Sequence, residues 1–170
     1  MGSEMCIRDR LSAGQEFDLK LVGARAQNWL RQEKSYKAFG SDLGRDAGPF
    51  ESSLSRFVDI DKNFLGKDAL LKRKTEVSCV TLLIDGPQDI DPWGREALYN
   101  ETEDSMLGRL TSGGYSVHFQ KSIGIGYVKS SFSEVGTKLR IKIDDAFWDA
   151  EIVKDSPYDP QNERILDRTR

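Results

Sequence analysis

The sequence predicts an α+β protein, in which the C-terminal piece of an α/β domain is followed by an antiparallel β-barrel of roughly six strands. Before residue 75, apolar residues recur at three- and four-residue steps, which is typical of helices. After it, short strand-like runs alternate with turn residues, which is typical of a closed barrel or sandwich. The change of pattern predicts a boundary near Lys74 to Val77, separating residues 11–74 from residues 75–170.

The first part is expected to begin with a long amphipathic helix from Asp18 to Phe39, ended by Gly40. A turn and a single strand are expected across Phe50 to Ile60. A second helix follows from about Phe64 to Lys74, with Asn63 as its cap. Because a lone strand needs partners, this part is expected to be the end of a larger domain. The apolar positions of the long helix are Leu19, Val22, Ala26, Trp29, Leu30, Tyr36 and Phe39.

The second part is expected to hold the barrel strands. Gly113 and Gly114 are expected to form a tight reversal between two of them, because glycine adopts the positive φ angles that such a turn needs. The alternation of Ile123, Ile125 and Tyr127 predicts a half-buried strand. The expected strands are Ser78–Ile84, Ala97–Asn100, Met106–Thr111, Ser122–Val128, Lys138–Ile143 and Phe147–Val153.

Composition excludes several classes of protein. Charged residues make up 31% and apolar residues 38%, with a net charge of -3, so the chain lacks the basic excess of a nucleic-acid partner. No apolar stretch reaches the roughly 20 residues of a membrane-spanning helix, and no membrane partner is expected. Cys6 and Cys79 lie far apart without CxxC spacing, so neither zinc nor a disulfide framework is indicated. A reducing compartment is expected, either cytoplasmic or, in a eukaryote, the mitochondrial matrix.

Residues 1–10 stand apart from the rest of the sequence. The string from Met1 to Arg10 has neither helical nor strand periodicity and resembles a junction artefact rather than native sequence. A frayed natural terminus is the alternative interpretation. In either case this segment is expected to be non-native or disordered.

No catalytic residue is assigned within this chain. His118 is the single histidine, and no Ser, His and Asp set can be assembled around it. Gly124 and Gly126 form a GxG, but the third glycine and the following helix of a dinucleotide site are absent. The acidic pairs Asp144-Asp145 and Glu103-Asp104 fall in predicted turns, where hydration is the default, so no metal site is expected.

Two charged residues are singled out as candidate contacts. Glu33 lies near the apolar stripe of the predicted helix, and a half-buried carboxylate must be paired, so Arg31 or Lys37 is its expected partner. A salt bridge tying helix to sheet is one interpretation, and contact with a polar ligand is the other. Arg56 is expected on the predicted strand, where a guanidinium can stack on a flat ring while donating hydrogen bonds to it. An exposed, solvated arginine is the alternative.

Five short motifs then occur in an order that is typical of one family. They are Asn28–Lys34 with Lys37–Gly40, then Pro49–Glu51, Asn63–Leu70, Thr111–Tyr115 with Gly126–Val128, and Gly136–Thr137. From Leu11 onward the chain therefore resembles the aminomethyltransferase superfamily, which includes the glycine-cleavage T-protein and the C-terminal tetrahydrofolate-binding half of dimethylglycine and sarcosine dehydrogenases. Asn28 and Ile90–Gly94 are more similar to the dehydrogenase branch.

The resemblance implies a folate-binding α/β piece followed by the barrel. The T-protein arginine that contacts folate aligns with Gln27, and a family aromatic beside the folate pocket aligns with Arg56. Together with Glu33, these two are the expected folate contacts. The residues expected to be structural are Arg31, Gly113, Gly114 and Tyr115.

The resemblance also implies a reaction for the intact parent protein. A FAD domain oxidises an N-methylated glycine, and tetrahydrofolate captures the released one-carbon unit as 5,10-methylenetetrahydrofolate. FAD and the acidic residue near the reacting folate nitrogen are expected in parts that precede this chain, so the isolated chain is expected to be inactive. Two alternatives stay open. One is a glycine-cleavage aminomethyltransferase acting on an aminomethyl substrate, and the other is a non-catalytic folate-binding or assembly module.

Overall fold

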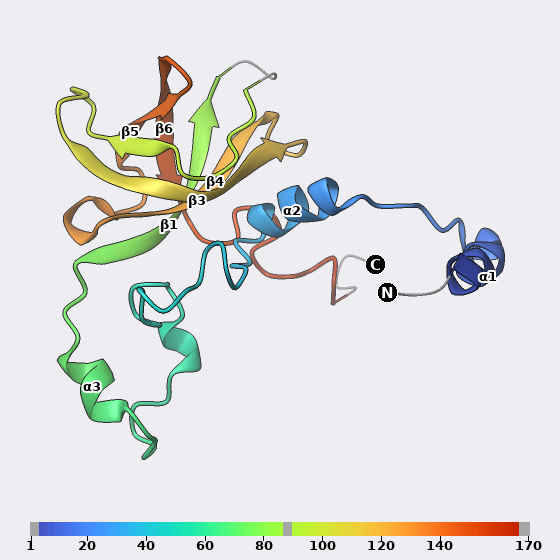
Figure 1. The fold of residues 1–170 in the computed structure, drawn as a ribbon, viewed down its shortest axis with the longest axis horizontal. Coiled ribbons are helices and arrows are strands. Elements are labelled where there is room, and N and C mark those ends of the chain that lie inside the picture. Colours follow the sequence, from blue (N-terminus) through green and yellow to red (C-terminus); the bar gives the residue numbers. More distant parts are fainter. Residues whose placement is uncertain (1–3, 87–89, 167–170) are drawn as a thin grey trace.

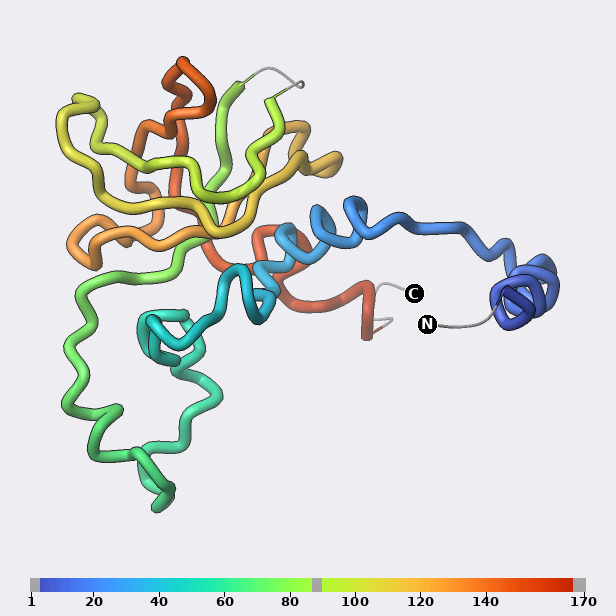
Figure 2. The backbone as a smooth tube through the Cα atoms, in the orientation of Figure 1, coloured from blue at the N-terminus to red at the C-terminus, as the bar shows by residue number. Residues whose placement is uncertain are grey.

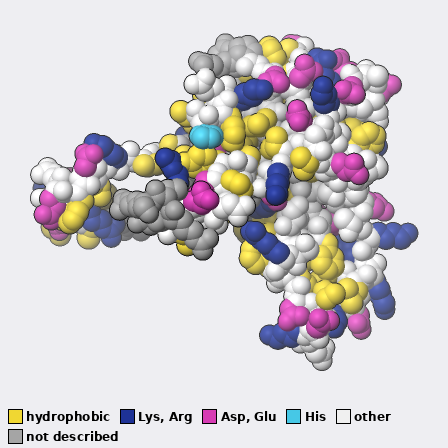
Figure 3. Space-filling view, turned by 180° about the vertical axis from the view of Figure 1, so that it is seen from behind, with side chains coloured by type: hydrophobic (Ala, Val, Ile, Leu, Met, Phe, Trp, Pro, Cys, Tyr) yellow, Lys and Arg dark blue, Asp and Glu magenta, His cyan; other side chains and the backbone are white. Residues whose placement is uncertain are grey.

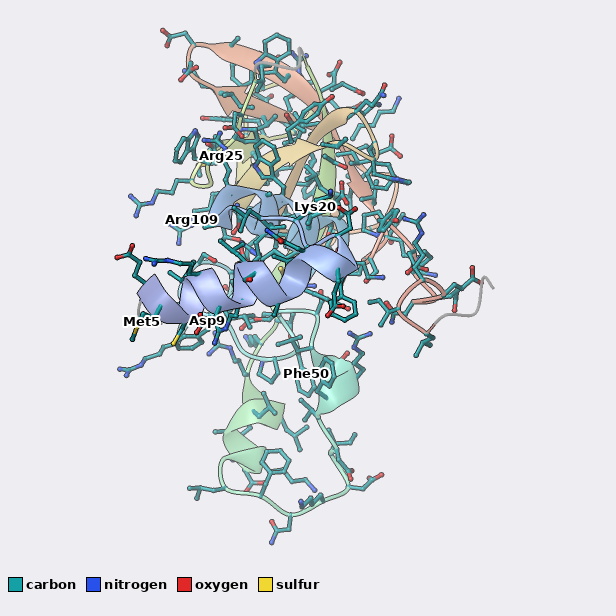
Figure 4. The ribbon with its side chains drawn as sticks, turned by 90° about the vertical axis from the view of Figure 1, so that its right-hand side faces the viewer. Met5, Asp9, Lys20, Arg25, Phe50 and Arg109 are labelled. Carbon is teal, nitrogen blue, oxygen red and sulfur yellow. The ribbon has the colours of Figure 1, made fainter. Side chains whose placement is uncertain are left out.

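The structure, a computed structural model, describes residues 4–86 and 90–166 of the chain. A β-barrel forms one end of the molecule, and the helices lie beneath it or away from it (Figure 1). α1 (Glu4–Gly14) stands apart from the barrel, α2 (Ala24–Glu33) runs beneath it, and α3 (Lys67–Lys72) lies at the far end of a separate excursion. Figure 2 shows this excursion leaving the barrel after α2 and returning into β1. Phe50 lies between the barrel and α3 (Figure 4).

Six antiparallel strands close the barrel in the order β1-β4-β3-β2-β5-β6, and β6 pairs back onto β1. This confirms the predicted antiparallel barrel. Closure pairs the backbone groups of every strand and leaves no open sheet edge. The strands are β1 (Val77–Asp85), β2 (Ala97–Tyr99), β3 (Met106–Ser116), β4 (Lys121–Lys129), β5 (Lys138–Ile143) and β6 (Ala146–Val153).

Alternate side chains of the strands fill the barrel interior. Leu82 and Ile84 on β1 and Leu139 and Ile141 on β5 are all buried in one cluster. The strand period of two places such residues on the same face, and burying each one stabilises the fold by about 1.5–3 kcal/mol. This cluster is the core on which the rest of the molecule is built.

β4 is buried on both of its faces. The predicted half-buried strand places Ile123, Ile125 and Tyr127 on one face, and the two isoleucines are fully buried there although they lie outside the barrel's interior cluster. The chain segment that contains α2 covers this outer face. The prediction of a half-buried strand is therefore wrong, because one layer of the preceding segment packs on the outside of the barrel.

α2 is shorter than the predicted helix, which ran from Asp18 to Phe39. The helix begins after Gly23, whose backbone is extended. It ends just before Ser35, which has a φ of 52°. The Ser35 side chain is buried and bonds the hydroxyl of Thr81 on β1 at 2.7 Å, which fixes this turn to the barrel. A tertiary hydrogen bond therefore ends the helix well before the apolar pattern does.

The face that α2 turns to the barrel combines the indole of Trp29 with buried polar side chains. Gln32 is fully buried, and its amide nitrogen donates to the carbonyl of Gly113 at 3.0 Å. Leu30 remains 57% exposed, and the residues predicted to extend its stripe are also exposed. Of the apolar stripe predicted as the packing face, Ala26 and Trp29 are half-buried. The other members of the stripe are exposed, namely Leu19, Val22, Leu30, Tyr36 and Phe39.

The predicted strand across Phe50 to Ile60 is also wrong. Every residue of that range is described, and the segment consists of turns and the 3₁₀ helix η2 (Ser55–Phe57). α3 begins after Gly66, at φ 89°, rather than after Asn63. The described part of residues 1–10 lies in the exposed helix α1, where the sequence pattern predicted no regular structure. The two remaining 3₁₀ helices are η1 (Gln15–Phe17) and η3 (Ser130–Phe132).

Gly113 and Gly114 do not form the predicted reversal. Both lie inside β3, pair with β4 and lack a positive φ. They are needed because neighbours approach closely: a Cβ on Gly113 would lie 2.5 Å from the carbonyl oxygen of Pro92, and one on Gly114 would lie 2.1 Å from the indole of Trp29. Trp29 also meets the ring of Tyr115 edge to face at 6.5 Å. Gly114 therefore makes room for α2 on the barrel, and Gly113 makes room for the backbone at Pro92.

We expect Gly114→Ala to destabilise the protein, because the new methyl group overlaps the indole of Trp29. Overpacking of this kind costs about 1–3 kcal/mol. Urea unfolding followed by tryptophan fluorescence measures the change. Gly44→Ala is the matched control, since a Cβ there meets nothing within 4 Å, and it should shift stability by less than about 0.5 kcal/mol. Equal stability of the two variants would contradict this account of the glycine.

Candidate functional site

A buried carboxylate, Asp42, joins α2 and its following loop to the barrel. Its Oδ2 accepts hydrogen bonds from Arg31 Nη1 at 2.7 Å and from the Ala38 N–H at 2.9 Å. Its Oδ1 accepts from the hydroxyls of Thr111 and Ser112 on β3, each at 2.6 Å. The side chain is fully buried, and its oxygens are satisfied by four donors from three parts of the chain.

Arg31 is held in place by the same network. Its guanidinium also donates to the carbonyl of Tyr36 at 2.9 Å, to Asn28 Oδ1 at 2.9 Å and to Ser112 Oγ at 2.7 Å. A guanidinium can make these bonds together because its donors lie in a rigid plane. Arg31 therefore links the helix, the loop and β3 through its hydrogen bonds.

Glu33 does not pair with Arg31 or Lys37, and that prediction is wrong. Its buried carboxylate accepts a short hydrogen bond from the hydroxyl of Ser116 at the end of β3 and a longer one, 3.5 Å, from the backbone N–H of His118. The partner of Lys37 is instead Asp155, with Nζ and Oδ2 2.9 Å apart. Glu33 therefore pairs with the barrel, and Lys37 pairs with the segment that follows β6.

Glu51 forms a second anchored carboxylate in the loop before η2. Burial by itself raises its pKa, but the N–H of Gly48 at 2.6 Å and the Arg73 guanidinium at 2.7 Å stabilise the charged form more, so the pKa is lowered from 4.5. Its backbone carbonyl accepts the N–H of Cys79 at 2.7 Å. The side chain of Glu51 thus binds Gly48 and Arg73, while its backbone binds Cys79 on β1.

Two groups that could act as nucleophiles are held neutral. Burial raises the pKa of the Cys79 thiol to about 12 and that of the Tyr127 hydroxyl to about 12. The Tyr127 hydroxyl donates to the carbonyl of Asp42 at 2.8 Å and contacts Ser52 Oγ at 2.9 Å. At neutral pH both groups stay protonated, so they serve as packing and hydrogen-bonding groups.

A groove of about 590 Å³ lies between the loop after α2, η2 and the segment that follows β6. We call it the Arg56 groove. Arg56 lies in η2 rather than on the predicted strand. Its guanidinium lies over the ring of Phe57, 4.7 Å from the ring centre. The charged residues lining the groove are Lys34, Lys37, Arg56, Lys154 and Asp155, and its remaining lining includes Ser35, Tyr36, Leu43 and residues 53–57.

The predicted folate contacts do not come together in one place. Arg56 lines the groove, whereas Glu33 is bonded to the end of β3. Gln27 is exposed on α2 and is not part of the groove. Lys34 and Lys37, which the sequence analysis did not predict as site residues, are brought to the groove because the chain turns sharply at Ser35. Asp42 was also missed, since nothing in its local sequence indicates a buried network.

A second cleft of about 500 Å³ lies between loop 40–47 and strands β1, β3 and β4. Asp42 and Tyr127 border it, together with Arg109, which is labelled in Figure 4. A third hollow of about 630 Å³ is lined by residues 63–69 alone and is an open turn before α3. Because it draws on a single segment, we do not treat it as a site.

Metal-ligand clusters and membrane-spanning helices are both absent from the described residues. Within residues 4–86 and 90–166, no three His, Cys, Asp or Glu side chains are grouped so that they could hold a metal ion. In the same ranges, no helix combines the length and the apolar character needed to cross a bilayer.

Two family models match the chain. The glycine cleavage T-protein C-terminal barrel domain matches residues 78–159, and the GCVT N-terminal domain matches residues 5–62, which begins inside the segment expected to be non-native or disordered. These are the two halves of the family that the motifs indicated, and they confirm the resemblance.

Known relatives agree with the family models. Mouse dimethylglycine dehydrogenase is 36% identical over 152 residues, which are 85% of this chain and 17% of that protein. An aminomethyltransferase from Caldanaerobacter subterraneus subsp. tengcongensis is 32% identical over 149 residues, which are 87% of this chain and 40% of that protein. The chain thus spans less than half the length of these relatives.

A solved structure shows the same fold. The aminomethyltransferase T of the glycine cleavage system from Bartonella henselae superposes with a TM-score of 0.78, over 92% of this chain and 44% of that one. Its sequence identity is 21%, so this likeness concerns the architecture.

We expect Asp42→Ala to lower the free energy of unfolding by about 2–4 kcal/mol, because Arg31 and two hydroxyls lose their buried acceptor. Chemical denaturation measures this loss. Asp46→Ala removes an exposed carboxylate from the same loop and should have little effect. A loss of similar size in both variants would argue against a special role for Asp42.

The lowered pKa of Glu51 predicts a pH-dependent contribution to stability. The contribution is present above its ordinary value of 4.5 and is lost as the pH falls through the lower value in the folded state. The melting temperature of Glu51→Gln should therefore lie below that of the unchanged protein at neutral pH, and the difference should shrink in acid. Glu134→Gln, an exposed surface change, is the control and should show no such trend. A constant difference across the pH range would rule out this charge effect.

Proposed function

Because the chain belongs to the aminomethyltransferase (glycine cleavage T-protein) family, we propose that it is the C-terminal, folate-binding part of a tetrahydrofolate-dependent one-carbon enzyme. Residues 11–74 would complete the folate-binding domain, and residues 75–170 would form the family's C-terminal barrel domain. The match to relatives over 85–87% of this chain carries the proposal.

Exposed apolar side chains support a longer parent protein. Leu21, Phe39 and Leu65 are 80%, 84% and 104% exposed, and they all precede the barrel. Figure 3 shows apolar side chains, in yellow, at the surface both of the barrel and of the segment beneath it. Large apolar side chains that are almost fully exposed would be buried by further protein in the parent. The relatives possess the additional chain that would cover them.

Two activities are candidates for the parent enzyme. Similarity to mouse dimethylglycine dehydrogenase favours oxidation of an N-methylated glycine, with FAD in a domain outside this chain. Similarity to aminomethyltransferases favours transfer from an aminomethyl substrate, without a flavin. A GxGxxG motif opening a βαβ unit in the parent sequence would favour the dehydrogenase. The mouse, rat and human dehydrogenases are described as mitochondrial, so a mitochondrial matrix location is proposed for a eukaryotic parent and a cytoplasmic one for a bacterial parent.

The residues of this chain suit binding rather than catalysis. Folate is an anion, and the Arg56 groove offers four cationic side chains against one carboxylate, which fits a negatively charged ligand. Bound tetrahydrofolate would supply the nucleophilic nitrogen that accepts the one-carbon unit. Asp42 and Glu51 are committed to internal partners, and Tyr127 and Cys79 stay protonated. None of them is assigned a catalytic role.

A non-catalytic folate-binding or assembly module is the remaining alternative. The family resemblance favours it, because that resemblance implies that Gln27 replaces a folate-contacting arginine of the T-protein. In this case the parent would bind folate or a partner protein without turning over a one-carbon substrate.

Titrating tetrahydrofolate into the full-length parent by calorimetry tests the proposal. We expect saturable binding and, at about 100 times Kd, stabilisation by about 2.7 kcal/mol against unfolding. Formation of 5,10-methylenetetrahydrofolate from dimethylglycine or sarcosine would identify a dehydrogenase, and formation from an aminomethylated carrier would identify the transferase. Binding without turnover of either substrate would indicate the non-catalytic module. If the titration produced no heat and tetrahydrofolate did not stabilise the protein, folate binding would be refuted.

A further inference from the structure

We propose that the second cleft, between loop 40–47 and strands β1, β3 and β4, binds a zwitterionic amino acid that carries an apolar side chain. We call it the Arg109 cleft, since Arg109 would bind the carboxylate of the ligand. Asp46 would bind the ammonium group, and the apolar lining would take the side chain. This proposal goes beyond the proposed function and does not depend on folate binding. The Arg109 cleft shares only Leu43 with the Arg56 groove.

Two opposite charges line the cleft without pairing with each other. Arg109 on β3 and Asp46 in the loop are both exposed. Within the described part of the chain, neither side chain forms an ion pair or a hydrogen bond. Asp42 also lines the cleft, but its carboxylate is neutralised by Arg31, whose Nη1 lies 2.7 Å away. The described lining therefore offers a cation and an anion that complement the carboxylate and the ammonium group of a zwitterion.

Apolar side chains supply much of the remaining lining. The volume of the cleft, about 500 Å³, falls within the range of small-molecule sites. Met106 is 52% exposed, and a flexible thioether adapts to ligands of different shape. An aliphatic side chain of a ligand would bury apolar surface here, whereas glycine would leave this lining unused. The apolar lining residues are Leu43, Ala47, Val77 and Met106, and the ring of Tyr127 adds to them.

Two hydroxyl groups of the lining already have partners inside the protein. The Thr111 hydroxyl donates to Asp42 Oδ1 at 2.6 Å, and the Tyr127 hydroxyl donates to the carbonyl of Asp42 at 2.8 Å. These groups need no hydrogen bond from a ligand. The planar guanidinium of Arg109, by contrast, is free to bind a carboxylate through two parallel hydrogen bonds. Arg109 and Asp46 would therefore fix the orientation of the ligand.

Internal contacts hold both sides of the cleft in place. Arg109 lies directly opposite Tyr127 on the paired strands β3 and β4, so the two side chains share one face of the sheet. The Tyr127 ring is fixed through its bonded hydroxyl. On the other side, the buried Asp42 anchors the loop, and Arg73 donates a hydrogen bond to the carbonyl of Asp46. Since little new order is needed on binding, this arrangement favours affinity.

The test titrates L-leucine into the full-length parent protein and follows the heat by calorimetry. We expect saturable binding with a Kd of about 1 mM, since the ligand is small and both charge contacts are exposed. Glycine should bind about tenfold more weakly, because it lacks the apolar side chain. Arg109→Ala and Asp46→Ala should each weaken leucine binding about two- to fivefold. Lys138→Ala and Glu134→Ala remove exposed charges of the same signs outside the cleft, and these controls should bind leucine as the unchanged protein does.

Two leucine analogues test the role of each charge. Isocaproate lacks the ammonium group, and isoamylamine lacks the carboxylate. Isocaproate should bind more weakly to Arg109→Ala than to the unchanged protein, and more tightly to Asp46→Ala, because the repelling carboxylate is gone. Isoamylamine should show the reverse order. The melting temperatures of both variants should match that of the unchanged protein, since neither side chain has a partner within the described part of the chain.

Several results would overturn the proposal. One is the absence of leucine binding at concentrations up to about 20 times the expected Kd. Another is equal affinity for leucine and glycine, which would leave the apolar lining without a role. Equal leucine binding by the two variants and the two controls would place the ligand outside this cleft. If the two analogues responded alike to Arg109→Ala and Asp46→Ala, the assignment of a zwitterion would fail.

Discussion

The buried carboxylate of Asp42 is the interaction on which the arrangement outside the barrel depends. It is reached by Arg31 from α2, by the backbone of the following loop and by two hydroxyls of β3. A fully buried charge is costly unless every oxygen is satisfied, so the helix, loop and strand must adopt one mutual position. The network thus specifies geometry more than it adds net stability.

That position has consequences further along the chain. With α2 fixed on β3, the chain must turn at once, and Ser35 does so at positive φ with its hydroxyl bonded to Thr81. The turn carries Lys34 and Lys37 to the wall of the Arg56 groove, where the segment after β6 meets them through Asp155 and Asp159. The charge of the groove is therefore produced by the docking of the helix rather than by a local cluster in the sequence.

The barrel was predictable from sequence because its strands are defined by local patterns. Leu139 and Ile141 alternate with charged residues, and turn residues separate each run, so the period of two and the strand ends are visible without a partner. The segment before it was not predictable in the same way. Leu30 and Phe39 continue a helical stripe, yet they remain exposed while Gln32 is buried against β3. Periodicity identifies an apolar face, but it does not show which face the neighbouring structure will cover.

The sequence by itself determined the antiparallel barrel and the family, since these follow from periodicity and ordered motifs. Only the tertiary structure decided which charges meet. Glu33 was expected to pair along its own helix, but Ser116, 83 residues away, is its partner. Gly113 and Gly114 were expected to turn the chain, but they make room for Pro92 and Trp29. Partners and close approaches of this kind depend on how distant segments pack, and that information is not carried by local spacing.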